Sequence, residues 1–292
     1  METIHPENQP LKIRILKVLV SLGITYVLFM AGIRLGFFLV KPMTSSANRA
    51  VAFAGLYAAM IGLWFTFLGF CAAVKNQRHL FSKLGRRETG NNLKTALLIG
   101  LPLGLGMNLL IALVALIQGN ITLTFRTFDP LMLLLFILVV FIQSCSEELM
   151  ARWFIYENVK RWFPKTPAVP ILVNAGFFMI LHLFNDGITW LSVVNLVLVG
   201  ILYSLLVYYY HSIWAAVVAH TTWNFCQNII LGLPNSGQPS DFSIFTLDAA
   251  KATNGFAYDT GFGLEGSVLT LIFLGLACLA IIWFGKKRQA RA

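Results

Sequence analysis

The chain has 292 residues, of which 58% are hydrophobic and only 12% are charged, and its mean hydropathy is +0.75. A soluble domain devotes about a quarter of its residues to charge, so this composition excludes an ordinary soluble protein. The net charge of +10 does not indicate a nucleic-acid partner. The basic residues fall in short segments between apolar runs, where they set the orientation of a membrane protein.

Apolar runs of about twenty residues recur along the chain, each long enough to cross a hydrocarbon layer of roughly 30 Å. They predict an all-α, polytopic membrane protein with about eight spans, built as one transmembrane domain over residues 1–292. The fifth and seventh runs are short, and a tilted or re-entrant course would suit them. The predicted spans cover residues 18–40, 51–74, 94–117, 131–156, 169–186, 190–210, 213–231 and 266–285.

The basic residues predict the orientation of these spans. An even number of spans places both termini on one side, and the side richer in lysine and arginine is cytoplasmic. Both termini are therefore predicted to be cytoplasmic. The residues counted on the outer side are Lys41, Arg49, Arg126 and Lys251. The larger set on the inner side is Lys12, Arg14, Lys17, Lys75, Arg78, Lys83, Arg86, Arg87, Lys94, Lys160, Arg161, Lys165, Lys286, Lys287, Arg288 and Arg291.

Two further features carry structural expectations. The longest outer segment, residues 232–265, contains Gly, Pro, Asn and Ser near its start, and we expect a plain solvated loop there in preference to a lid or a partner surface. The four cysteines show no paired spacing, so we expect small buried side chains and neither a disulfide framework nor a CxxC metal site.

The fourth span contains SCSEELMAR, residues 144–152, which brings charge to membrane depth. Ionisable groups there are rare and usually face a bundle interior or a wet cavity. Glu148 and Arg152 are four residues apart on one helix face, in the favourable order for an ion pair. Glu147 points about 100° away and lacks that partner. Glu147 is therefore the predicted reactive carboxylate, whereas Glu148 and Arg152 either form an internal ion pair or support the chemistry.

Two later spans add polar groups. His182 follows Phe178 by four residues on the fifth span, and His220 and Asn224 are four residues apart on the seventh. A lone histidine on an apolar helix is usually a core residue, so neither histidine is diagnostic alone. At a rise of 1.5 Å per residue, the two histidines, Asn224 and Glu147 fall in one layer of the cytoplasmic half. A single site drawn from three helices is the expectation.

A carboxylate, two histidines and an amide can hydrolyse an acyl bond without a covalent step. The carboxylate takes a proton from water, one histidine orients the water or binds a metal, and a His–Asn pair stabilises the oxyanion. The HExxH zinc motif is absent. Zinc nevertheless remains a candidate cofactor, with Glu147, His182 and His220 as ligands from separate helices. No GxSxG motif occurs, which disfavours a serine nucleophile.

These residues fall into three short motifs in chain order. Together the motifs resemble those of the CPBP family, which comprises the type II CAAX prenyl proteases and the bacteriocin-processing or Abi-like membrane proteins. The resemblance covers about residues 140 to 230, within a predicted catalytic core of about 130–231. The motifs are Glu147-Glu148-x-x-x-Arg152, Phe178-x-x-x-His182 and His220-x-x-x-Asn224.

The resemblance implies a conical helical bundle with an intramembrane cavity, and a role for each motif residue. Glu147 would activate water, with the other two residues of its motif in support. His182 would share that water or bind a metal, and His220 and Asn224 would form the oxyanion site. The family is usually classed with metalloproteases, and the sequence leaves the need for zinc open.

The function predicted from these residues is that of an intramembrane endopeptidase. Its partners would be membrane lipids and a membrane-associated or lipidated peptide or protein, without nucleic acid, in a bacterial plasma membrane. Whether the substrate is prenylated is open. One alternative is a non-catalytic scaffold or bacteriocin-immunity protein that keeps the fold. Another is a proton-coupled transporter, which would favour an internal repeat and a polar path to both faces.

Overall fold

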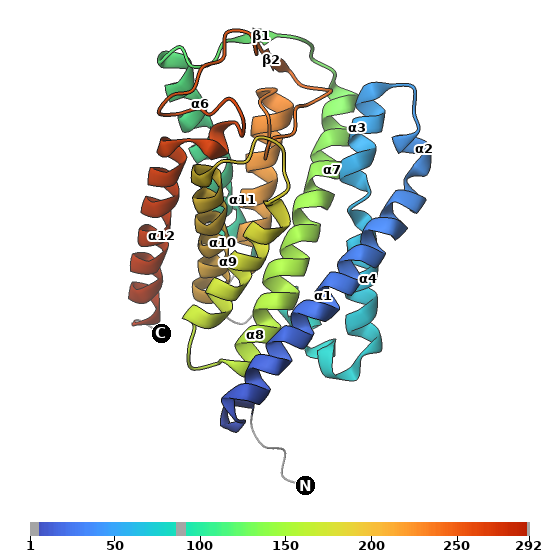
Figure 1. The fold of residues 1–292 in the computed structure, drawn as a ribbon, viewed down its shortest axis with the longest axis vertical. Helices are drawn as coiled ribbons and strands as arrows, with labels where there is room; N and C mark the ends of the chain where they lie inside the picture. The colour runs from blue at the N-terminus through green and yellow to red at the C-terminus, as the bar shows by residue number, and fades with distance from the viewer. Residues whose placement is uncertain (1–5, 86–91, 291–292) are drawn as a thin grey trace.

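The computed structural model describes residues 6–85 and 92–290, so the predictions for Arg86, Arg87 and Arg291 lie outside the described residues. Within those ranges the protein is a bundle of long helices, with one short pair of strands at one end (Figure 1). The α-helices are α1 (Leu11–Leu39), α2 (Lys41–Thr44), α3 (Arg49–Ala58), α4 (Ile61–Ala73), α5 (Asn92–Thr95), α6 (Met107–Ile117), α7 (Pro130–Glu148), α8 (Tyr156–Trp162), α9 (Ala168–His182), α10 (Trp190–Tyr210), α11 (Trp214–Asn224) and α12 (Val268–Gln289). The other elements are the 3₁₀ turns η1 (Pro6–Asn8), η2 (Lys75–Lys83) and η7 (Leu264–Gly266), the π-helical segments η3 (Ala96–Gly100), η4 (Pro102–Gly106), η5 (Leu149–Ile155) and η6 (Phe225–Ile230), and the strands β1 (Leu123–Phe125) and β2 (Phe245–Leu247).

All of the predicted apolar runs form helices. In the described part of the chain, six helical stretches are long and apolar enough to cross a membrane, which confirms a multi-pass membrane protein. The two predicted spans outside this set are the ones expected to be short, namely α9 and α11 with its continuation η6. Whether these two cross the membrane fully stays a prediction. The six stretches are Leu11–Leu39, Arg49–Ala73, Asn92–Ile117, Pro130–Trp162, Trp190–Tyr210 and Val268–Gln289.

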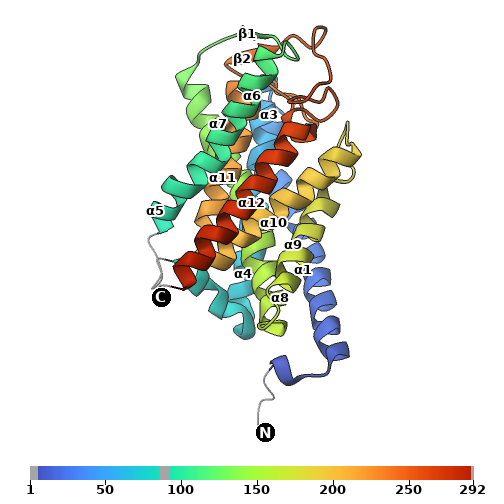
Figure 2. The same cartoon turned by 90° about the vertical axis from the view of Figure 1, so that its left-hand side faces the viewer.

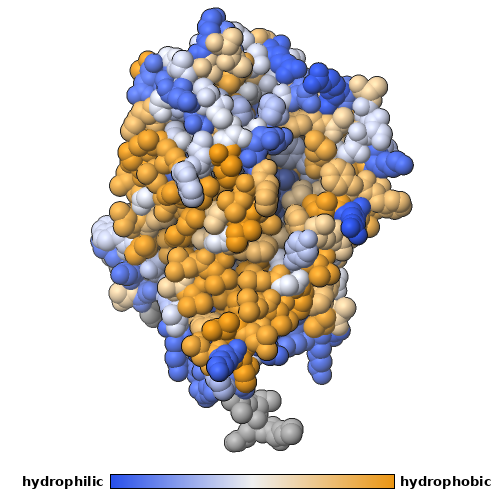
Figure 3. Space-filling model, viewed as in Figure 1, coloured by the Kyte–Doolittle hydropathy of each residue, from blue (hydrophilic) through white to orange (hydrophobic). Residues whose placement is uncertain are grey.

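The two ends of the bundle differ in character. The start of α1 and the end of α12 lie at the same end, together with η2 and α8, whereas β1 and β2 lie at the opposite end (Figures 1 and 2). A band of hydrophobic side chains covers the middle of the face in Figure 3, between two more hydrophilic ends. An even number of spans requires both termini at one end, as the structure has them. The assignment of this end, the predicted basic end, to the cytoplasm stays a prediction.

The helix that carries the two glutamates is fixed at its start by a proline and a cap. Pro130 occupies the first turn of α7, and the Asp129 carboxylate accepts from the backbone N–H groups of Leu131 and Met132 at 3.0 and 3.1 Å. The π-helical segment η5 follows directly after Glu148, and η6 follows directly after Asn224. Such widened turns occur frequently at functional sites.

Small residues let α1 and α4 approach closely. A Cβ atom added at Gly36 would lie 1.6 Å from the Ala59 carbonyl oxygen, and one added at Gly62 would lie 2.0 Å from the Gly32 carbonyl oxygen. The two backbones therefore touch without intervening side chains. Within a membrane, where burial of apolar surface gives little drive for helix association, close packing of this kind holds helices together.

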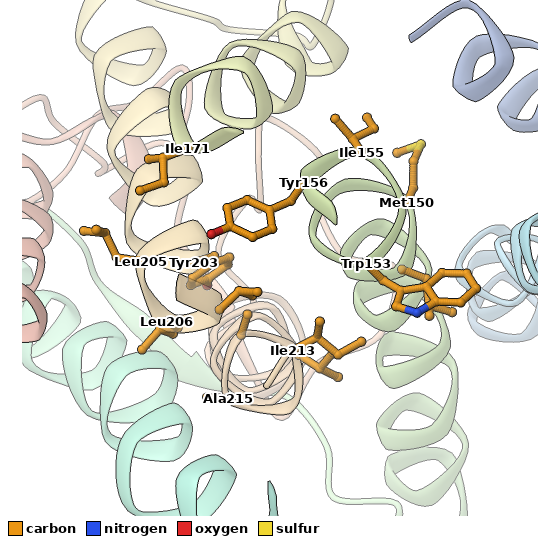
Figure 4. Packing of buried hydrophobic residues seen from close by; sticks show 14 of the residues in the cluster. Met150, Trp153, Ile155, Tyr156, Ile171, Tyr203, Leu205, Leu206, Ile213 and Ala215 are labelled. Atoms are coloured by element: carbon orange, nitrogen blue, oxygen red, sulfur yellow. The ribbon is translucent and has the colours of Figure 1, made fainter. Parts of the chain in front are cut away.

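Buried side chains pack around η5, in the part of the bundle between the two glutamates and α8. In Figure 4 the Tyr156 ring points toward Tyr203 of α10, whereas Trp153 lies on the opposite side of its helix, and both side chains are fully buried. The Trp153 indole N–H also donates to the Leu80 carbonyl in η2 at 2.7 Å. The segment after the first motif is therefore held from several sides. The cysteines agree with expectation, since all four are free and buried.

The segment 232–265 is packed against the bundle, so the expectation of a plain solvated loop was wrong. Strand β2 within it pairs antiparallel with β1, and Phe242 stacks on Phe136 of α7 with ring centroids 5.1 Å apart. Several apolar side chains of the segment are buried against helices. They are Leu233, Phe242, Tyr258, Phe262 and Leu264. Their spacing follows no helical or strand period, which is why the sequence did not predict their burial.

Candidate active site

The Glu148–Arg152 pair predicted from spacing is present and fully buried. The Glu148 Oε1 atom lies 3.0 Å from Arg152 Nη1 and also 3.0 Å from His220 Nδ1. The Arg152 guanidinium lies over two rings, 4.5 Å from the centroid of Phe178 and 5.3 Å from that of Tyr203. Glu148 therefore connects the first motif to the third through His220. Arg152 connects the first motif to the second through Phe178.

Glu147 has one oxygen held and one oxygen free of hydrogen bonds. Its Oε1 atom accepts from the Gln143 side-chain amide at 2.5 Å, one turn earlier on α7. Its Oε2 atom is buried without a hydrogen-bond partner and lies 3.8 Å from His220 Nε2. A buried carboxylate oxygen without a donor is costly unless a bound group uses it.

His182 stands at the end of α9 with a defined tautomer. Its Nδ1 atom lies 2.8 Å from the carbonyl oxygen of Phe178 on the preceding turn. Because a carbonyl oxygen can only accept, Nδ1 carries the hydrogen, and Nε2 of a neutral ring is left as an acceptor. The spacing of the second motif thus has a local cause, since residue 178 supplies the carbonyl that orients the imidazole.

The third motif presents its two side chains one turn apart on α11. His220 uses Nδ1 toward Glu148, which leaves Nε2 facing Glu147. The Asn224 amide nitrogen donates to the Gln143 side-chain oxygen at 3.1 Å, and its oxygen accepts from the Asn235 side-chain amide at 3.0 Å. Both side chains are buried.

One cavity of about 320 Å³ brings together the residues predicted to be reactive, Glu147, His182, His220 and Asn224. Glu148 and Arg152 lie behind this layer without lining the cavity, and Glu148 contacts it through His220. The structure thus places side chains from α7, α9 and α11 in one site, as the depth estimate required. The space is of the size usual for ligand pockets.

The same stretch of chain matches a known family. Residues 129–226 match the family model described as "Type II CAAX prenyl endopeptidase Rce1-like". The match covers about a third of the chain and supports a CPBP family intramembrane protease, and we call residues 129–226 the Rce1-like domain. All three motifs lie within the matched residues, whereas the first three membrane spans and α12 lie outside them. No curated protein and no solved structure matches the chain. The Rce1-like domain supports an intramembrane protease, in agreement with the resemblance of the motifs.

The loop that follows the Rce1-like domain completes the wall of the site. Asn235, Ser236 and Gln238 line the cavity with the motif residues. Asn228 anchors this loop, since its side-chain amide lies 3.1 Å from the Leu233 carbonyl and 3.2 Å from that of Gln238. Asn228 lies in η6, four residues after Asn224, so the polar side chains that begin with the third motif continue into loop contacts. Asn235, Ser236 and Gln238 were not predicted to line the site.

Two further residues near the Rce1-like motifs were not predicted. Gln143 is four residues before Glu147, a spacing that could have identified it. Glu265, just before α12, lines a smaller cavity that also borders His182 and His220. Its carboxylate accepts from the Trp223 indole at 3.2 Å and from the Ser236 backbone N–H at 2.5 Å, and burial raises the pKa of Glu265. Glu265 therefore ties the loop to α11.

The predicted zinc ligands do not form a ready metal site in this Rce1-like domain. Glu147, His182 and His220 line the same cavity, but across residues 6–85 and 92–290 no three His, Cys, Asp or Glu side chains are arranged to hold a metal ion. Each histidine is held within the protein through Nδ1, an arrangement that metal-binding histidines commonly have. Zinc binding by Glu147, His182 and His220 stays a prediction, and no step below is assigned to a metal.

Proposed function

We propose that the chain is an intramembrane endopeptidase in which Glu147 activates water to hydrolyse a peptide bond of a membrane-associated or lipidated substrate. One observation carries this proposal. The Oε2 atom of Glu147 is buried, lacks a hydrogen-bond partner and lies among two histidines and an amide at a cavity wall. The Rce1-like family of the surrounding residues supports the same class of reaction.

The proposed reaction begins with a water molecule between Glu147 and His182. Glu147 Oε2 accepts one water proton as the oxygen attacks the peptide carbonyl carbon, while His182 Nε2 accepts a hydrogen bond from the other water hydrogen. The C–N bond then breaks, and the proton held by Glu147 passes to the leaving nitrogen. The products are a carboxylic acid and an amine, and the enzyme returns to its initial protonation state.

The oxyanion of this reaction would be stabilised by His220 and Asn224. The Asn224 amide group has two hydrogens, of which one is directed to Gln143 and the second is available. A His220 ring with hydrogens on both nitrogens donates to Glu148 through Nδ1 and to the oxyanion through Nε2. Glu148 and Arg152 thereby position the ring without touching substrate. Loss of one oxyanion donor typically lowers the rate by about 10² to 10³.

The test uses full-length protein reconstituted into lipid bilayers. Internally quenched peptides are supplied in two matched forms, one with a prenylated cysteine near the C-terminus and one with the cysteine unmodified. Wild type is compared with Glu147→Gln and with the control Glu157→Gln, a half-buried glutamate in α8 outside the cavity. We expect wild type and the control to cleave, and Glu147→Gln to lose about 10² to 10⁴ in rate.

The outcomes separate the competing functions. Cleavage by Glu147→Gln at the wild-type rate would refute the role of Glu147. A wild type that cleaves neither peptide form nor a diverse peptide library, while still conferring a cellular phenotype, would support a scaffold or immunity protein. Activity that requires one tightly bound zinc per chain would replace the water-only scheme with a metal scheme. A location in a bacterial plasma membrane stays a prediction.

A further inference from the structure

We infer that Gln143 is a positioning residue for Glu147, and that Asn235 of the 232–265 loop completes the arrangement through Asn224. The inference rests on the proposed function, because it assigns Gln143 a role in holding the proposed base. Gln143 belongs to none of the three motifs. Its side chain is half-buried on α7 and lines the cavity beside Glu147.

The hydrogen bonds around Gln143 have a fixed direction. An ionised carboxylate can only accept, so the atom that Gln143 turns to Glu147 Oε1 at 2.5 Å is its amide nitrogen. Its oxygen then faces the other way and accepts from Asn224 Nδ2 at 3.1 Å and from Ser144 Oγ at 3.1 Å. Asn224 in turn directs its own oxygen to Asn235 Nδ2 at 3.0 Å.

This direction has a consequence for catalysis. A glutamate side chain has several rotatable bonds, and a base must be held in the productive geometry by its neighbours. Gln143 holds Oε1 of Glu147 and leaves Oε2 toward His220 and the cavity. The same amide fixes which end of Asn224 is the donor. Gln143 thus sets the orientation of both the proposed base, Glu147, and the proposed oxyanion donor, Asn224.

The loop enters the same network through Asn235. Asn235 is buried and is bridged to Gln238 by two backbone hydrogen bonds of 3.0 and 2.9 Å, which form a tight turn beside the cavity. Its side chain orients the Asn224 amide only while this turn lies against α11. The network therefore connects the placement of the loop to the orientation of Asn224, Gln143 and Glu147.

The test compares Gln143→Met, which keeps the side-chain length and removes both hydrogen-bonding groups, with Gln77→Met. Gln77 is a matched control because it is also half-buried and donates to one side chain, Asn158, at 3.0 Å, near the basic end. The kinetic parameters kcat and KM are measured with the best-cleaved quenched peptide. We expect Gln143→Met to lower kcat by about 10- to 100-fold with KM unchanged. Gln77→Met is expected to stay within about twofold of wild type.

Two further variants distinguish positioning from a merely structural role. Asn235→Ala leaves α7 intact, and we expect a several-fold lower kcat with KM unchanged. In a Glu147→Gln background, Gln143→Met should cause no further loss of the residual rate, because no base remains to be positioned. An equal fold-loss in that background, or wild-type kcat for Gln143→Met in an otherwise native chain, overturns the inference. If Glu147→Gln itself keeps full activity, the proposed function fails first.

Discussion

Removal of the Arg152 guanidinium would test the buried charge cluster that holds the first and third motifs together. In wild type the guanidinium lies 3.0 Å from Glu148 and over the rings of Phe178 and Tyr203, and both charged side chains are fully buried. Arg152→Met leaves the Glu148 carboxylate buried without this partner. Breaking a buried pair in this way costs about 3–5 kcal/mol of folding free energy. An ion pair between exposed side chains contributes only about 0–1 kcal/mol.

The protein supplies its own control for this prediction. Arg49 pairs with Asp241 at 2.8 Å, but the two side chains are 85% and 40% exposed, so Arg49→Met should cost less than about 1 kcal/mol. The assay is reversible unfolding in detergent micelles, followed by tryptophan fluorescence. A double variant, Glu148→Gln with Arg152→Met, should recover part of the loss because it removes the unpaired charge. Equal losses of stability for Arg152→Met and Arg49→Met would show that burial of the Glu148–Arg152 pair does not raise the cost of breaking it.

Two other predictions concern packing and the loop anchor. Gly62→Ala should lower stability by about 1–3 kcal/mol, because the new Cβ would lie 2.0 Å from the Gly32 carbonyl oxygen, whereas Gly69→Ala, with nothing within 4 Å, should be neutral in the same unfolding assay. Burial raises the pKa of Glu265, so the folded state binds the proton of the Glu265 carboxyl group more tightly than the unfolded state does. The stability of wild type relative to Glu265→Gln should therefore be greatest below the ordinary value of 4.5 and fall as pH rises through the folded pKa. A difference that does not change with pH would contradict this assignment.

The helices and the local pairs were predictable because their determinants are local. Apolar runs encode helices whose backbone hydrogen bonds close within a few residues, and a four-residue spacing places Glu148 beside Arg152 whatever the rest of the fold does. The same logic placed His182 and Asn224 at a common depth with Glu147. These features needed no knowledge of how the helices pack.

The remaining features depend on tertiary structure. Contact between Glu148 and His220 requires that α7 and α11 face each other with matching rotation, which depth alone does not determine. The burial of Leu233 and Phe262 follows from docking of an irregular segment without a period. The four-residue spacing of Gln143 and Glu147 could have been read from the sequence, but an amide beside a carboxylate on a helix is common. It indicates a role in the site only once the contact between Gln143 and Asn224 is known.

In the proposed mechanism, the carboxylate of Glu147 performs the chemistry. The most direct measurement is the rate of peptide-bond cleavage by purified, reconstituted wild type and Glu147→Gln, with the products identified by mass spectrometry. We expect a defined product from wild type and a rate lower by at least about 100-fold for the variant, at unchanged thermal stability. The same product at the wild-type rate from Glu147→Gln would contradict the proposed mechanism.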